Sequence, residues 1–171
     1  MGNQYYNFKN IVSDFELLQR KHKQLNSFGI GDIKQLLFLT QQNKDVENVN
    51  NNSPVYPLLY LVPQTATRDT ATITYNFNVI VCDIENTKNY DIEVDLWSDT
   101  LQIAEDILAQ FKYSVTAQQG NFENKYYVNL PTNIQPFSES YEDLLVGWNL
   151  QIQIVVDSPL NRCIAPYKDF E

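Results

Sequence analysis

The sequence predicts an α+β domain in which a mainly antiparallel β-sheet carries two long amphipathic helices on one face. Two segments show the three-and-four spacing of apolar residues that is typical of helices, and two others alternate apolar and polar residues as strands do. The order is helix, strands, helix, strands, without the repeated strand-helix-strand alternation of a parallel sheet. With 171 residues, of which 43% are hydrophobic, we predict a single domain over residues 1–171.

The first segment, from about Gln4 to Leu25, is predicted to be a long amphipathic helix. We interpret His22 as a partly buried residue on the apolar face of this helix. The two glycines in Asn26–Asp32 predict a sharp turn after the helix. The apolar stripe consists of Phe8, Ile11, Val12, Phe15, Leu18, His22 and Leu25.

The segments that follow the turn predict a loop and two strands. Ile33–Leu39 fits a strand or a helix, whereas the asparagine-rich Gln41–Ser53 predicts an exposed loop. Val55–Pro63 is rich in strand formers, and Pro57 favours an edge position or the start of a strand. Strict alternation between Thr70 and Asp83 predicts a half-buried strand, with one face formed by Ile73, Tyr75, Phe77, Val79 and Val81.

The second half of the chain predicts a helix, a hairpin and two more strands. Apolar spacing from Val94 to Phe111 indicates the second helix. Tyr113–Gln119 and Tyr126–Leu130 predict a hairpin with an extended tip. Ile134–Tyr141 predicts a strand that a tight connection at Glu142–Gly147 joins to the last one, which alternates from Trp148 to Val156. Residues 157–171 are predicted to form an extended C-terminal arm.

No group of residues predicts an active site, a cofactor site or a metal site. His22 is the only histidine, and its predicted place on a helix gives no sign of a catalytic loop. Cys82 and Cys163 lie far apart, so we expect both to be reduced, with Cys82 a small buried apolar residue. The acidic residues between Asp83 and Asp99 lack the spacing of a calcium loop and are interpreted as solvated. We therefore expect no enzymatic activity.

Charge and hydropathy exclude further classes of function. The chain has 12 Lys and Arg against 21 Asp and Glu, a net charge of −9, which argues against a groove for nucleic acid or an anionic membrane. No stretch reaches the length of a membrane span, and residues 1–9 lack the apolar core of a signal peptide, so we expect a cytoplasmic protein.

Aromatic side chains near the predicted termini and the hairpin tip are candidates for contacts between subunits. Rings with a polar tip bury a large area at interfaces, which makes them common in protein contacts. The interface candidates are Tyr5, Tyr6, Phe122, Tyr126, Tyr127, Tyr167 and Phe170.

Several short phrases occur in an order that resembles a known family. They are Ser27–Ile33, Tyr56-Pro57, Thr74–Phe77 running into Cys82-Asp83, Ser98–Ala104, Gly147-Trp148, Val156–Pro159 and Arg162-Cys163. Together they resemble the tail-completion or tail-terminator-like neck proteins of tailed bacteriophages, especially crAss-like and related Bacteroidales phages. The similarity covers most of the chain. The chain departs from the family at residues 41–53 and 119–125. The resemblance therefore does not indicate which proteins these two loops contact.

The resemblance implies a tail-terminator-like fold and a structural role in the virion. Copies of the chain would form a cyclic ring in the neck or tail, between portal or connector proteins and the tail, after assembly in the host cytoplasm. Double-stranded DNA would pass through the lumen without specific binding, and the excess of acidic residues suits such a channel because phosphate contacts are repelled. The alternative is a stand-alone small enzyme or ligand-binding α+β domain, since fold alone does not determine function.

Overall fold

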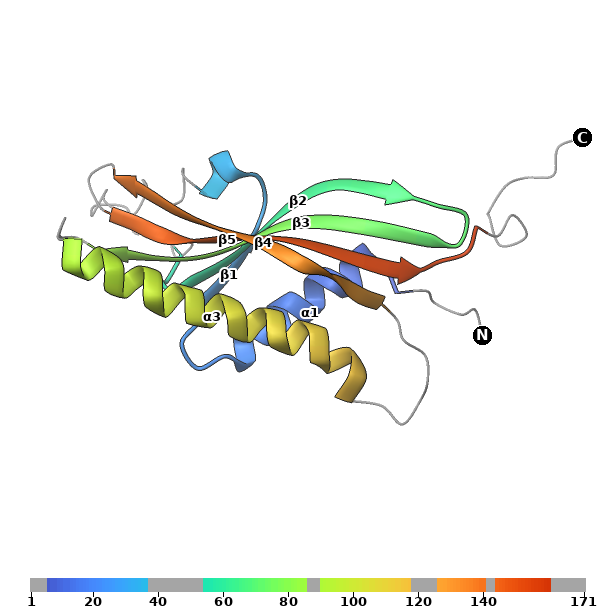
Figure 1. Cartoon of the computed structure of the whole chain (residues 1–171), viewed down its shortest axis with the longest axis horizontal. Helices are drawn as coiled ribbons and strands as arrows, with labels where there is room; N and C mark the ends of the chain where they lie inside the picture. Colours follow the sequence, from blue (N-terminus) through green and yellow to red (C-terminus); the bar gives the residue numbers. More distant parts are fainter. Residues whose placement is uncertain (1–5, 37–53, 86–89, 118–125, 141–143, 161–171) are drawn as a thin grey trace, which may run out of the picture.

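The computed structural model describes residues 6–36, 54–85, 90–117, 126–140 and 144–160 (Figure 1). Its five strands form one sheet in the order β1-β2-β3-β5-β4. A helical turn at residues 33–36 lies between β1 and β2 along the chain. The elements are α1 (Phe8–Lys21), β1 (Ser27–Ile30), β2 (Leu58–Arg68), β3 (Thr72–Glu85), α3 (Tyr90–Ala117), β4 (Tyr126–Ser140) and β5 (Leu144–Asp157).

The predicted fold class, a mainly antiparallel sheet with two long helices packed on one face, is wrong. The sheet is mixed, because β1 pairs in parallel with the first four residues of β2. The helices also differ greatly in length, with 14 residues in α1 and 28 in α3. β1 falls in the segment that was predicted to be a turn. Four residues are too few to show the alternation by which strands are detected in a sequence.

Helix α1 is shorter than predicted, and a cap defines each of its ends. Asn7 caps the N-terminus: its side chain accepts a bond from the Asn10 N–H at 3.1 Å, and the Asn10 side chain accepts one from the Asn7 N–H at 3.0 Å. At the other end His22 is the C-cap, with an extended backbone at φ −76° and ψ 130°. His22 therefore follows the helix and is not part of it, in contrast to the prediction.

The glycines after α1 are required by close packing, not by a turn. No glycine among the described residues has a positive φ. A Cβ atom on Gly29 would lie 2.6 Å from Cδ2 of Tyr60, and one on Gly31 would lie 2.5 Å from the Tyr60 hydroxyl. The Tyr60 ring, buried on the neighbouring strand, thus occupies the space that a larger residue in place of Gly29 would need, and at Gly31 the Gln35 side chain lies closer still.

The predicted hairpin between residues 113 and 130 is wrong. Residues 113–117 continue α3, and the tip of the predicted hairpin lies outside the described residues. Strand β4 instead joins the two predicted segments Tyr126–Leu130 and Ile134–Tyr141, with an irregularity in register between Asn129 and Asn133. The prediction missed this continuity because Pro131 interrupts the alternation.

The two alternating strands and the second helix are confirmed. β3 and β5 pair in antiparallel register along their whole lengths. Their apolar positions face α1 and α3 on what we call the helix-side face of the sheet. This core includes Ile11 and Phe15 of α1, Ile103, Ile107 and Phe111 of α3, and Phe77, Val79, Val81, Leu150, Ile152 and Ile154 of the sheet.

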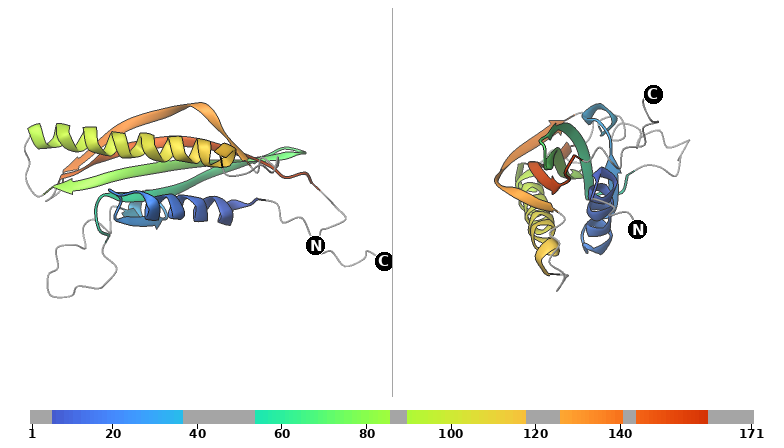
Figure 2. Two further views of the ribbon diagram at one scale, coloured as in Figure 1. Left: turned by 90° about the horizontal axis from the view of Figure 1, so that it is seen from below. Right: turned by 90° about the vertical axis from the view of Figure 1, so that its right-hand side faces the viewer.

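The opposite, or outer, face of the sheet has a smaller apolar cluster near the helical turn. In the end-on view of Figure 2, α1 and α3 lie below the strands and the helical turn lies above them. Leu36 of this turn is 1% exposed and packs there on Tyr60 of β2 and Ile80 of β3. The helical turn thus covers the part of the outer face around Tyr60 and Ile80. Within the described residues, no helix is both long and apolar enough to cross a membrane.

Candidate functional site

The end of β2 and the turn that follows it form an arm with one open edge. We call residues 63–71 the hairpin arm (Figure 1). β1 accompanies β2 only as far as Leu61, whose carbonyl accepts a bond from the Gly31 N–H at 3.0 Å. All residues from Pro63 to Arg68 are exposed. In the part of the chain that the structure describes, no strand pairs with this side of β2 beyond Leu61.

The tip of the hairpin arm is held by the segment that follows β5. The Ser158 N–H donates to the Ala71 carbonyl at 2.8 Å, and the Leu160 N–H donates to the Thr70 carbonyl at 3.0 Å. The Arg68 guanidinium also donates to the Ser158 hydroxyl at 3.1 Å. The first residues of the predicted C-terminal arm are therefore tied to the sheet, and residues 161–171 lie outside the described residues.

The register of the hairpin shows which backbone groups face the open edge. The Asp69 N–H donates to the Thr72 carbonyl at 2.9 Å, which closes the hairpin. Pairs that are bonded and pairs that are not bonded alternate along an antiparallel ladder. Thr67 opposite Thr74 is therefore a bonded pair, whereas the N–H groups of Ala66 and Arg68 point away from β3 toward the open edge.

The other edge of the sheet, β4, is less suited to pairing with a further strand. It contains Pro131 and Pro136, which have no N–H to donate, and its register shifts between Asn129 and Asn133. Prolines and bulges at an edge are common means of preventing association between sheets. The hairpin arm also has a proline, Pro63, and a register shift between Pro63 and Ala66, but both lie at its base, and its ladder to β3 is regular from Ala66 to Arg68. The open part of the arm is therefore the short edge from Ala66 to Arg68.

The predicted interface aromatics fall into three groups. Tyr6 and Tyr126 pack inside the chain, with ring centroids 4.7 Å apart, and the Tyr6 hydroxyl donates to Asp14. Burial and the bond to Asp14 raise the pKa of the Tyr6 phenol above its ordinary value. Tyr127 is 56% exposed, on the outer face. The remaining candidates, Tyr5, Phe122, Tyr167 and Phe170, lie outside the described residues.

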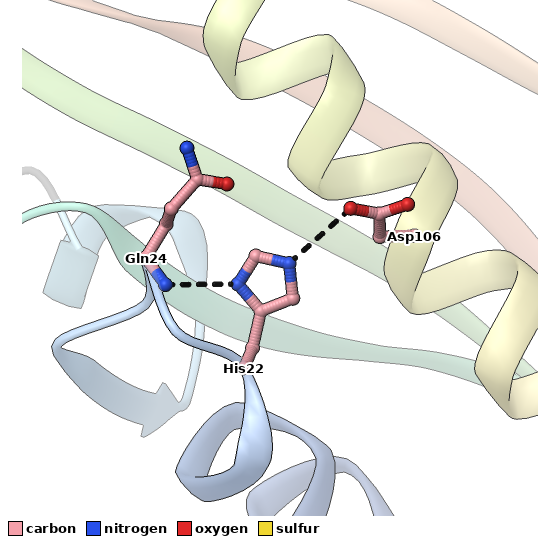
Figure 3. A network of polar contacts seen from close by, with 3 residues as sticks. All are labelled: His22, Gln24 and Asp106. Carbon is pink, nitrogen blue, oxygen red and sulfur yellow. Dashed lines mark hydrogen bonds and ion pairs between the residues drawn. The ribbon is translucent and has the colours of Figure 1, made fainter.

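A hollow of about 640 Å³ lies between the end of α1 and the middle of α3, and His22 lines it. Figure 3 shows the polar contacts of His22 with Gln24 and Asp106. The imidazole Nδ1 accepts a bond from the Gln24 N–H at 3.3 Å. Because Nδ1 is an acceptor, Nε2 carries the proton and faces Asp106 Oδ2 at 3.5 Å. Two lysines also line the hollow, Lys21 and Lys23.

The arrangement around His22 is that of a link between two helices. A general base needs a ring nitrogen with a free lone pair within reach of a substrate. Here Nδ1 is occupied by the backbone, and the protonated Nε2 points to a carboxylate whose side chain is 56% exposed. The contact therefore joins the end of α1 to α3, and nothing in its geometry activates a nucleophile.

Cys82 is confirmed as a buried apolar residue. It is fully buried in the outer-face cluster, and this burial raises the pKa of its thiol. Cys163 lies outside the described residues. Among the residues that the structure describes, no three His, Cys, Asp or Glu side chains are grouped so as to hold a metal ion.

Sequence analysis missed the hairpin arm, although the chain contains a signal for it. Thr65-Ala66-Thr67 continues β2 past Pro63, and Asp69-Thr70 is a turn pair, but the apolar run was taken to end at the proline.

No protein-family model and no curated protein matches this chain.

Proposed function

We propose that this chain is a bacteriophage virion protein that forms a cyclic ring in the head–tail neck or in the tail. The ring joins portal or connector proteins to the tail, and DNA passes through its lumen. The proposal rests on the ordered sequence resemblance and on one structural observation, the hairpin arm. An enzymatic role is not part of it.

The hairpin arm supports the proposal because a ring needs two different complementary surfaces on each subunit. Head-to-tail contacts are heterologous, so the surface that a subunit offers on one side must differ from the surface on the other. The open edge at Ala66 and Arg68 offers outward donors, whereas the β4 edge carries prolines. Since residues 158–160 tie down its tip, the arm reaches a neighbour at low cost in ordering.

The charge of the chain supports passage of DNA without binding. A net charge of −9 repels the phosphate backbone, and stable DNA binding depends on replacing counterions by Lys and Arg. A ring of such subunits therefore surrounds a duplex without retaining it.

Cryo-electron microscopy and mass spectrometry of purified virions test the proposal. We expect the polypeptide in the particles and ring-shaped density in the neck or tail into which this fold fits. Infectious particles that lack the polypeptide would refute the proposal. Turnover of a substrate by the isolated chain would instead favour the alternative, a stand-alone enzyme that uses the hollow beside His22.

The contribution of the arm is tested with a matched pair of variants. Ala66→Pro removes an N–H that points to the open edge, whereas Ala66→Val keeps it, and neither interrupts the ladder to β3. We expect Ala66→Pro particles to lose infectivity at least tenfold relative to Ala66→Val particles. Equal infectivity of the two would show that the arm is not used in assembly.

A further inference from the structure

The middle of the outer face is covered by carboxamide side chains. Where strands β3, β5 and β4 lie side by side, the register aligns Asn76 with Gln153 and Asn129, and Asn78 with Gln151 and Asn133. The chain holds 19 Asn and 14 Gln in total, and six of them meet on this face. We call these residues the carboxamide face: Asn76, Asn78, Asn129, Asn133, Gln151 and Gln153.

The carboxamide face is hollowed. A hollow of about 250 Å³ is lined by Asn76, Asn78, Asn133, Gln151 and Gln153. The irregular part of β4 forms one wall through Pro131. None of the lining residues is charged, although the chain as a whole carries −9. The volume is near the lower limit of ligand pockets, which begin at about 300 Å³, so the hollow suits one small unit of a longer ligand.

Bonds between neighbouring strands hold some of these amides in place and leave others available. Asn133 Nδ2 donates to Gln151 Oε1, and Asn129 Nδ2 donates to Gln153 Oε1, each at 3.3 Å. Among the described residues, no bond engages the Nε2 groups of these two glutamines or either end of the Asn78 amide. Each free Nε2 carries two N–H donors, and the oxygens beside them are acceptors.

One buried polar atom on the outer face, close in register to the hollow, has no hydrogen-bond partner among the described residues. Asn149 Oδ1 lies two residues along β5 from the lining residue Gln151, and its side chain is on the same face of the sheet. Buried polar atoms are usually hydrogen-bonded, so such exceptions require an explanation. A site that receives a polar ligand, directly or through water, supplies one.

We propose that the carboxamide face binds an uncharged saccharide. Hydroxyl groups donate and accept at once, so each hydroxyl of a sugar ring can pair with an amide N–H and with an amide oxygen of this face. Tyr127 lies two residues from Asn129 on the same face, and its ring, 56% exposed, offers an apolar surface for the sugar's C–H groups. The lack of charge disfavours phosphates and uronic acids as ligands.

A printed array of neutral glycans, followed by NMR with the best trisaccharide, tests the proposal. We expect a Kd of about 1 mM or tighter and shifts of the side-chain NH₂ signals of Gln151 and Gln153. The double variant Gln151→Ala with Gln153→Ala is expected to weaken binding at least tenfold, and Tyr127→Ala to weaken it similarly. Gln102→Ala removes an exposed amide of α3 and serves as the matched control.

Three outcomes would overturn the saccharide site. They are no binding across the array, binding that the double variant leaves unchanged, and sedimentation showing that a second copy of the chain covers the face in solution. Unfolding curves of each variant separate loss of binding from loss of fold. Asn76 donates to the Thr65 carbonyl of the hairpin arm at 2.7 Å, but the two proposals are tested at different residues, Ala66 in the arm and Tyr127, Gln151 and Gln153 on the carboxamide face. The failure of either proposal therefore leaves the other standing.

Discussion

The helix-side face and the outer face of the sheet are built from the same strands but differ in chemistry. On the helix-side face, Phe77, Val79 and Ile152 are at most 1% exposed beneath α1 and α3. On the outer face the residues between them in sequence are amides, such as Asn78 and Gln151, and most of them reach the solvent. The alternation of strands thus separates the side chains that stabilise the fold from those available for contacts.

The largest expected difference between the faces is in stability. Phe111 is fully buried on the helix-side face and stacks on Phe15 at 4.2 Å and on Tyr126 at 5.1 Å between ring centroids. Phe111→Ala leaves a cavity there and should lower the free energy of unfolding by about 3–5 kcal/mol. Chemical denaturation followed by far-UV circular dichroism measures this loss.

The control for this comparison is Tyr127→Ala, which removes an aromatic ring from the outer face. Tyr127 is 56% exposed, so this change should alter the free energy of unfolding by no more than about 0.5 kcal/mol. Similar losses in the two variants would contradict the assignment of stability to the helix-side face.

The long regular elements could be predicted from the sequence because their patterns are long. β3 and β5 have 14 residues each, enough for the alternation to identify both the strands and their buried faces. β1 and the hairpin arm could not be predicted in this way. Gly29 has its place because of the Tyr60 ring, which is far away in the sequence, and no local pattern reports such a contact.

The candidate sites were harder to predict than the fold, because they depend on register. Asn78, Gln151 and Asn133 are polar residues of three separate strands, and only the pairing of these strands brings them together. In the same way, Tyr6 was expected at an interface because it lies near the N-terminus, and Tyr126 because it lies near the predicted hairpin tip. The structure instead packs their rings against each other in a tilted arrangement, which a sequence pattern does not show.

Alkaline pH tests the helix-side face through Tyr6. Burial raises the pKa of its phenol above the ordinary 10.0. Above about pH 10 the unfolded chain therefore loses this proton more readily than the folded chain, and stability falls as the pH rises, by at most about 1.4 kcal/mol per pH unit. Water near the half-buried ring reduces this limit.

The variant Tyr6→Phe removes the titrating group from this position. Unfolding curves between pH 9 and about pH 11 should show a smaller decrease in stability for Tyr6→Phe than for the unmodified chain. The slope is the measurement that matters, because the variant also loses the bond to Asp14 at every pH. An equal slope in both proteins would show that Tyr6 is solvated in the folded state.

The smallest expected effect comes from the contact between His22 and Asp106, at the rim of the helix-side core. Asp106→Asn keeps an acceptor for the imidazole Nε2–H but removes the carboxylate charge. Because the Asp106 side chain is 56% exposed and the contact is 3.5 Å long, the loss in the free energy of unfolding should stay below about 1 kcal/mol. Gln102→Asn, an exposed change on the same helix, is the matched control. A loss of several kcal/mol would mean that the two helices depend on this link, and that the apolar core beneath them contributes less than its burial indicates.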